Sequence, residues 1–230
     1  MKMRGLLFVT ALLMNLISAK ADAILPDPSW NEEMPPAEIF GENDSLAATP
    51  ESVSVSVAPL AAKDKVFATA YFDTLSILTA RNTCSDFFGG PEAAAHVFSR
   101  LMEKAQKNPL PGVVAMNMTG SPVEVTDERT NSRYRLFDRV MINRDGPFYR
   151  NRVPYSFAQI PRLGSFQANT RQVRVLMFLH ELGHAIKGDD GKWLLPDDGK
   201  DDELSRRNSQ KIEDVCGEQI NALRNAKQEQ

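Results

Sequence analysis

The stretch VLMFLHELGHAIKG, residues 175–188, is the part of the sequence that decides the fold. Most of its side chains are apolar, and among them stand His180, Glu181 and His184. Residues four positions apart lie on the same face of an α-helix. The spacing therefore predicts two imidazole rings that point the same way from one helix.

The flanking sequence sets the expected ends of this helix. We expect it to cover residues 168–187, because Gly188 and the Asp pair after it are typical of a helix end. A polar residue should cap its start by accepting a backbone hydrogen bond. The candidates for this cap are Ser165, Asn169 and Thr170.

Two histidines in this arrangement can bind one Zn²⁺ ion through their ring nitrogens. Glu181 lies in the same turn and suits a general base that takes a proton from a water molecule that the metal activates. This is the HExxH arrangement of metallopeptidases. The alternative is a pair of surface histidines on an amphipathic helix. The apolar flanks favour the metal site, because a buried carboxylate without a partner would be costly.

Catalytic zinc usually has three protein ligands and one open position. No histidine follows His184, so the third ligand should be a carboxylate. Lys187 stands where the metzincin motif needs glycine, and that spacing is excluded. The candidates are Asp189, Asp190, Asp197, Asp198, Asp201, Asp202, Glu203, Glu213, Asp214 and Glu218.

We choose Asp198 among these carboxylates. Pro196 and Gly199 shape a tight bend around it, and a rigid bend can hold a short side chain in place. Glu203 is the main alternative, because it fits the thermolysin-like spacing loosely and has a longer side chain. The other carboxylates also stay open. The alternative for Asp198 itself is a solvated turn residue, since turns favour aspartate without any metal.

A family resemblance agrees with this choice. The sequence resembles a group of secreted zinc metallopeptidases from acidobacteria and related bacteria over about residues 64–220. The matching residues are Asn82, Cys84, Phe87–Gly90, Asn143–Phe148, Leu179–His184, Leu195–Gly199, Ser205, Asn208, Ser209 and Cys216. Ser209 departs from the family pattern, in which threonine is usual. The resemblance implies a secreted zinc protease-like protein and points to the second Asp of the bend, but it implies no substrate.

The spacing of apolar residues in the rest of the chain predicts an α+β fold. Helices are expected at residues 63–80, from Pro91 onward and at 205–227. Strands are expected at residues 113–118, 123–126 and 133–143, the last with apolar residues at alternate positions. We therefore expect a zincin-like fold, in which a small antiparallel sheet packs on the HExxH helix and a C-terminal helix supports it.

Residues 129–174 hold ten arginines, no lysine and two acidic residues. If the strand at residues 133–143 is a sheet edge beside the site, a substrate could pair with it as an added strand. Arg135 and Arg139 would then flank the cleft and favour an acidic peptide. The simpler interpretation is that these arginines are solvated and protect the edge from aggregation.

The N-terminal residues are typical of a secretory signal peptide, with Lys2 and Arg4, a short apolar run and Ala-x-Ala sites. We expect cleavage after Ala21, so residues 1–21 are the signal peptide. An uncleaved anchor is the alternative, but the run is short for a bilayer. Residues 22–60 form an arm rich in proline and acidic residues. It could be a pro-segment, and residues 61–230 form the metallopeptidase domain.

The composition excludes several classes of protein. The chain has 230 residues, 42% of them hydrophobic and 25% charged, with a net charge of −3. An acidic chain is not a general nucleic-acid binder, and two cysteines cannot build a Cys₄ zinc module. In an exported protein Cys84 and Cys216 should form a disulfide, although two buried thiols are the alternative.

The function expected from the sequence is zinc-dependent hydrolysis of peptide bonds in peptides or proteins outside the cytoplasm. The ligands would be His180, His184 and Asp198, and Glu181 would be the catalytic residue. The alternative is a secreted module that binds zinc, or keeps a degenerate protease fold, without catalysis. We expect no nucleic-acid partner and no membrane anchor after cleavage.

Overall fold

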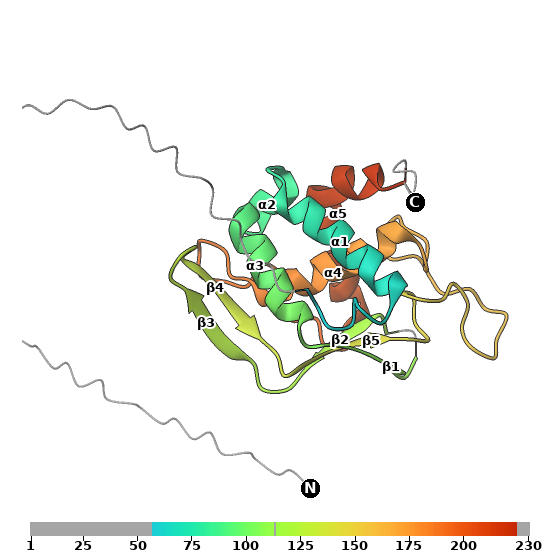
Figure 1. Ribbon diagram of the computed structural model, residues 1–230. Helices are drawn as coiled ribbons and strands as arrows, with labels where there is room; N and C mark the ends of the chain where they lie inside the picture. Colours follow the sequence, from blue (N-terminus) through green and yellow to red (C-terminus); the bar gives the residue numbers. More distant parts are fainter. Residues whose placement is uncertain (1–56, 113, 225–230) are drawn as a thin grey trace, which may run out of the picture. The chain divides into compact units, whose positions relative to one another are not determined.

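The computed structural model describes residues 57–112 and 114–224, and these residues form a mixed α+β fold (Figure 1). The expected signal peptide lies outside the described residues, as does the expected arm up to residue 56. The last residues of that arm are described, and among them Ala58 is fully buried. The elements are α1 (Lys65–Thr79), α2 (Thr83–Phe87), α3 (Pro91–Met102), β1 (Ala105–Asn108), β2 (Met116–Thr119), β3 (Val123–Asp127), β4 (Ser132–Leu136), β5 (Arg139–Asn143), α4 (Arg171–Ala185) and α5 (Asp202–Ala222).

Side chains at the helix starts explain where the helices begin. Asp64 caps α1 by accepting hydrogen bonds from two backbone N–H groups of its first turn, at 3.0 Å each. Pro91 begins α3, where its missing N–H costs nothing. Thr170 is the residue that caps α4, accepting from the Val173 N–H at 3.3 Å. The cap of α4 thus falls on one of the three residues expected from the sequence.

Helix α4 is the centre of the fold. It packs against α1, α3 and α5, and most of its side chains are buried. The ring of Phe178 contacts the rings of Phe67, Phe98 and Phe148 at centroid distances of 5.5, 5.6 and 5.3 Å. Burial of several aromatic rings at one point holds the helix firmly in the core. The HExxH motif therefore sits on a well-fixed element.

The strands form two small sheets instead of one antiparallel sheet. In the first sheet β5 is central, pairing in parallel with β1 and antiparallel with β2. In the second, β3 and β4 form an antiparallel hairpin. The expectation of a wholly antiparallel sheet is wrong, because β1 joins through a parallel pairing. Its sequence, AQKN, has no apolar alternation that could have indicated a strand.

The strand expected at residues 133–143 is also corrected. It is interrupted at Phe137 and Asp138, and the chain passes there from the hairpin to the three-stranded sheet. The apolar alternation breaks only at Asp138 and resumes in the same phase at Val140, so the pattern indicated one strand and could not show the change of partner. Since β5 is central in its sheet, this half of the segment is not an edge to which a substrate strand could be added.

Helix α5 lies along α4 and is tied to the N-terminal helices by a disulfide. Cys216 on α5 is bonded to Cys84 on α2, as expected from the sequence. Thr83 adds a hydrogen bond from its hydroxyl to the Val215 carbonyl at 3.1 Å. A disulfide is typical of an oxidising compartment outside the cytoplasm. Among the described residues, no helix is both long enough and apolar enough to cross a bilayer.

Candidate metal centre

The two histidines of α4 lie on the face that turns towards α5. His180 and His184 are 7% and 3% exposed. Their Nε2 atoms are 3.0 Å apart, so both rings direct the same nitrogen to one point. Two unprotonated ring nitrogens at this distance repel each other unless a proton or a cation lies near both.

The loop after α4 brings Asp198 to this point. Backbone hydrogen bonds fasten the loop to the last turns of the helix, from Leu194 N–H to the Ile186 carbonyl and from Leu195 N–H to the Gly183 carbonyl, both at 3.0 Å. Leu195 is fully buried against Gly183, where an added Cβ would lie 2.6 Å from the leucine Cδ1. Only glycine allows the loop to approach the helix so closely.

The third donor completes a compact triangle. Asp198 Oδ2 lies 3.0 Å from His180 Nε2 and 3.5 Å from His184 Nε2. Bonds of 2.0–2.2 Å at tetrahedral angles would separate two zinc ligands by about 3.4 Å. The three edges of 3.0, 3.0 and 3.5 Å are close to that separation. The cluster of His180, His184 and Asp198 can therefore hold a metal ion.

Helix α5 supplies contacts that orient two of these donors. The Ser209 hydroxyl lies 3.0 Å from His180 Nδ1, which leaves Nε2 for the metal. The Asn208 side-chain amide donates to the Pro196 carbonyl at 3.0 Å and lies 3.4 Å from Asp198 Oδ2. Such partners fix the ring and carboxylate orientation of metal ligands. His184 Nδ1 is buried without a hydrogen-bond partner among the described residues.

Glu181 is half-buried next to the cluster. Within the described residues, its carboxylate has no hydrogen bond and no ion pair. Burial raises the pKa of Glu181 above its ordinary value, and the neighbouring histidines only partly oppose this effect. A carboxylate that is free of partners beside three convergent donors is available for proton transfer.

The charges of the cluster shift the pKa values of its members in opposite directions. Burial raises the pKa of Asp198, but hydrogen bonds with the two histidines lower it by more, so the net pKa lies well below its ordinary value. Burial lowers the pKa of His184, and its hydrogen bond to Asp198 and the charge of Glu181 raise it by more. The site thus favours a negative carboxylate with a positive charge beside it.

The other carboxylates considered as third ligands lie outside the cluster. Glu203 is exposed in the first turn of α5, where it pairs with Arg206 and Arg207. Asp201 caps α5, and Glu213 accepts a hydrogen bond from the Ser165 N–H at 2.9 Å. Among the described residues, Asp198 is the one carboxylate that joins the two histidines.

The arginines expected to flank a cleft have different environments. Arg135 is 7% exposed, and its guanidinium donates to the His184 carbonyl and to the Asp197 carboxylate. It is therefore not free to bind a substrate. Arg139 is exposed at the start of β5, the central strand of its sheet.

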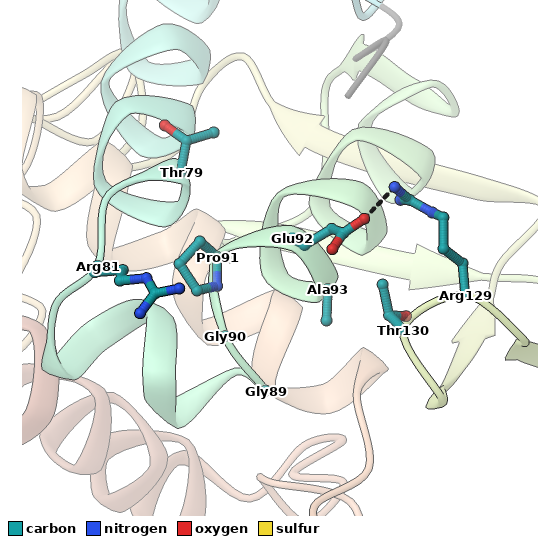
Figure 2. Close-up of a pocket in the computed structure, with 9 residues that line it drawn as sticks. All are labelled: Thr79, Arg81, Gly89, Gly90, Pro91, Glu92, Ala93, Arg129 and Thr130. Atoms are coloured by element: carbon teal, nitrogen blue, oxygen red, sulfur yellow. Dashed lines mark ion pairs between the residues drawn. The ribbon is translucent and has the colours of Figure 1, made fainter. Parts of the chain in front are cut away.

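A separate cavity lies at the start of α3 (Figure 2). It has a volume of about 490 Å³ and is lined by Thr79, Arg81, Gly89, Gly90, Pro91, Glu92, Ala93, Arg129 and Thr130. Glu92 and Arg129 form an ion pair at its rim. None of its lining residues belongs to the histidine and aspartate cluster, so the cavity is not part of the candidate centre.

No family model matches the chain, and no curated protein or solved structure matches it. The family resemblance based on the motifs therefore stays a prediction. The arguments for function rest on the geometry of the cluster and on the chemistry of its side chains.

The sequence indicated no role for Asn208 and Ser209, and the role that it indicated for Arg135, beside a substrate cleft, differs from the contacts that the structure shows. For Asn208 and Ser209 the helical spacing could have indicated a role. Asn208 lies four positions before Ile212 and Ser209 lies three before it, so both share the inward face of α5. For Arg135 no local signal existed, since its partners lie 49 and 62 positions away.

Proposed function

We propose that this protein is an exported zinc-dependent peptidase with a zincin-like active site. His180, His184 and Asp198 would hold the zinc ion, and Glu181 would act as general base. The observation that carries the proposal is the triangle of donor atoms, with edges of 3.0, 3.0 and 3.5 Å, beside a carboxylate that has no partner among the described residues.

The donor set supports zinc as the metal. Two imidazole nitrogens and one carboxylate oxygen are ligands that zinc accepts in catalytic sites, which keep a fourth position open. Zinc bound in this way would polarise a carbonyl oxygen and lower the pKa of a water molecule at its open position. Soft sulfur ligands are absent from the cluster, because both cysteines are in the disulfide.

Glu181 supplies the proton chemistry. It neighbours His180 in sequence and so lies in the same turn as the first ligand, while His184 lies one turn further on. A carboxylate in this place can take a proton from the attacking water and pass it to the nitrogen of the leaving amine. Peptide hydrolysis needs both proton transfers, so one half-buried carboxylate can serve both steps.

Two features support the proposed place of action. The sequence of residues 1–21 has the anatomy of a signal peptide, and a disulfide such as that between Cys84 and Cys216 is typical of an oxidising compartment. We therefore propose that the enzyme works in the periplasm or outside the cell. Its substrates would be peptides or proteins that it meets there.

The proposal is tested with the variant Glu181→Gln. The amide keeps the size of the side chain but cannot accept the proton, so zinc should stay bound while peptide hydrolysis falls by at least about 100-fold. Zinc content is measured by elemental analysis, and hydrolysis by mass spectrometry of a peptide library. Glu203→Gln is the matched control and should keep full activity.

Two results would contradict the proposal in different ways. Full activity in the Glu181→Gln variant would exclude Glu181 as the base. A wild-type protein that binds zinc but cleaves no peptide in the library would favour a zinc-binding module without catalysis.

A further inference from the structure

Arg135 is a buried cation that joins three parts of the molecule. It lies on β4, and its Nε donates to the His184 carbonyl of α4 at 2.8 Å. Its Nη2 and Nη1 donate to the two oxygens of the Asp197 carboxylate, at 2.9 and 3.4 Å. Its guanidinium also lies over the ring of Trp193, 4.5 Å from the centroid. A charged group this buried is stable only because its donors are used.

The partners of Arg135 stand directly beside the donors of the cluster. His184 is a ligand candidate itself, and its carbonyl belongs to the last turn of α4, where helix carbonyls lack partners within the helix. Asp197 precedes Asp198 in the loop. The side chain of Asp197 is 77% exposed, so little besides Arg135 restrains it. One guanidinium therefore connects the helix that carries the histidines to the loop that carries the aspartate.

This contact also distinguishes the two adjacent carboxylates. Asp197 is held by Arg135, whereas Asp198 Oδ2 faces the two histidines. Backbone hydrogen bonds hold the loop at Leu194 and Leu195, but Arg135 is the one described side chain that holds the Asp197 carboxylate away from the cluster. A planar guanidinium suits this task better than an ammonium group, because its donors bind a carboxylate in a fixed, two-point geometry.

We propose that Arg135 is a positioning residue of the metal centre, which fixes the loop of Asp198 against the end of α4 through Asp197 and the His184 carbonyl. The inference rests on the proposed metal site, but it does not need peptidase activity. It makes Arg135 part of the support of the metal and not a contact for substrate.

The direction in which zinc affinity changes when Arg135 is removed separates a positioning role from simple electrostatics. A positive charge near a cation site weakens metal binding, so electrostatics alone predicts that removing Arg135 raises zinc affinity. Positioning predicts the reverse, because loss of a residue that orients a ligand typically lowers metal affinity about 10- to 100-fold. The two explanations therefore predict opposite changes.

The experiment measures zinc affinity of the full exported chain by competition with a chelating dye. The variants are Arg135→Gln, Asp197→Asn and the double variant, with Arg139→Gln as the control of equal charge change. We expect each single variant to bind zinc about 10- to 100-fold more weakly and the double variant to be no weaker than the worse single one. Arg139→Gln should bind as the wild type does.

A second measurement reports the geometry of the site. The visible absorption spectrum of the cobalt(II)-loaded protein depends on the arrangement of ligands around the metal, and it should change in Arg135→Gln and Asp197→Asn but not in Arg139→Gln. Arg135→Lys keeps the charge without the two-point geometry, so it should not restore the wild-type spectrum.

Failure of the positioning role and failure of the proposed metal site would give different results. Unchanged or raised zinc affinity in Arg135→Gln would overturn the inference. If that variant does not fold, judged by circular dichroism of the metal-free protein, Asp197→Asn tests the same contact from its exposed side. Loss of a negative charge weakens zinc binding by electrostatics alone, so the cobalt(II) spectrum decides for this variant, and an unchanged spectrum would overturn the inference. A wild-type chain that binds no metal would instead refute the proposed function, and the positioning role with it.

Discussion

Among single residues, the third metal ligand separates two interpretations of the sequence, one with Asp198 and one with Glu203. Asp198 Oδ2 lies 3.0 and 3.5 Å from the histidine nitrogens, whereas Glu203 pairs with arginines on the surface of α5. We predict that Asp198→Ala weakens zinc binding more than about 100-fold, because loss of a ligand exceeds the effect of losing its support. Dye competition measures this change.

Glu203→Ala is the matched control for that prediction and should leave zinc affinity unchanged. The reverse result, with Asp198→Ala unaffected and a large loss in Glu203→Ala, would place the metal in a thermolysin-like arrangement. It would also mean that the loop of residues 189–201 has a different position when metal is bound.

The hydroxyl of Ser209 gives a second prediction at this scale. It lies 3.0 Å from His180 Nδ1 and so holds the ring with Nε2 towards His184 and Asp198. Ser209→Ala should lower zinc affinity about 10- to 100-fold. Ser209→Thr keeps the hydroxyl and should bind zinc as the wild type does, which isothermal titration would show. Equal affinities in all three proteins would remove Ser209 from the support of the site.

The sequence alone was sufficient to predict that His180 and His184 point to one place on a helix with Glu181 beside them, because that relation depends only on the period of a helix. It was less informative for Asp198, which is placed by backbone contacts between a loop and the helix it follows. The positions of Ser209 and Arg135 depend on how α5 and β4 pack against α4. That information is in the fold and not in the local sequence.

At the scale of elements, the close contact between α4 and the following loop predicts the effect of Gly183→Ala. Alanine in a helix interior normally stabilises by about 1 kcal/mol relative to glycine. Here the new Cβ would lie 2.6 Å from Leu195 Cδ1, and overpacking costs about 1–3 kcal/mol. We expect a net loss of up to about 2 kcal/mol in the free energy of unfolding, together with weaker zinc binding, since the loop carries Asp198.

Gly217→Ala in α5 is the control for this prediction. An added Cβ there would meet its nearest neighbour, Glu213 Cγ, at an ordinary 3.7 Å, so this variant should gain stability. Denaturant unfolding compares the two variants. If Gly183→Ala is as stabilising as Gly217→Ala, the loop does not press on the helix. In a Leu195→Ala background, where the clash is absent, Gly183→Ala should no longer destabilise the protein.

The helices were easier to predict than the strands. The expected range of 168–187 contains α4, and 63–80 contains α1, because caps and apolar spacing are local features. Helix α2 was missed because it has only five residues, too few for a periodic pattern. Strand β1 and the interruption at Phe137 depend on pairing partners distant in sequence, which alternation cannot reveal.

At the scale of the whole molecule, the α+β class followed from the sequence but the connections between its parts did not. The parallel pairing of β1 with β5 joins residues about 35 positions apart. The disulfide is different, because two cysteines in a chain with an expected signal peptide have one intramolecular pairing available. It could be expected without knowledge of the fold, and it reveals that α2 lies against α5.

That bond gives the last prediction, on the stability of the domain. It closes a span of 132 residues between α2 and α5, and α5 carries Ser209 and Asn208 to the metal centre. In the loop-entropy model, closure of so long a loop stabilises by roughly 4–5 kcal/mol, which is an upper bound. The variant Cys84→Ser with Cys216→Ser should lose up to about this amount of the free energy of unfolding, measured with a denaturant.

A reducing agent should destabilise the wild type to a similar extent and leave the double variant unchanged. A wild type that is indifferent to reduction would show that the bond does not support the domain, and α5 would then be held against the metal centre by its packing on α4 alone.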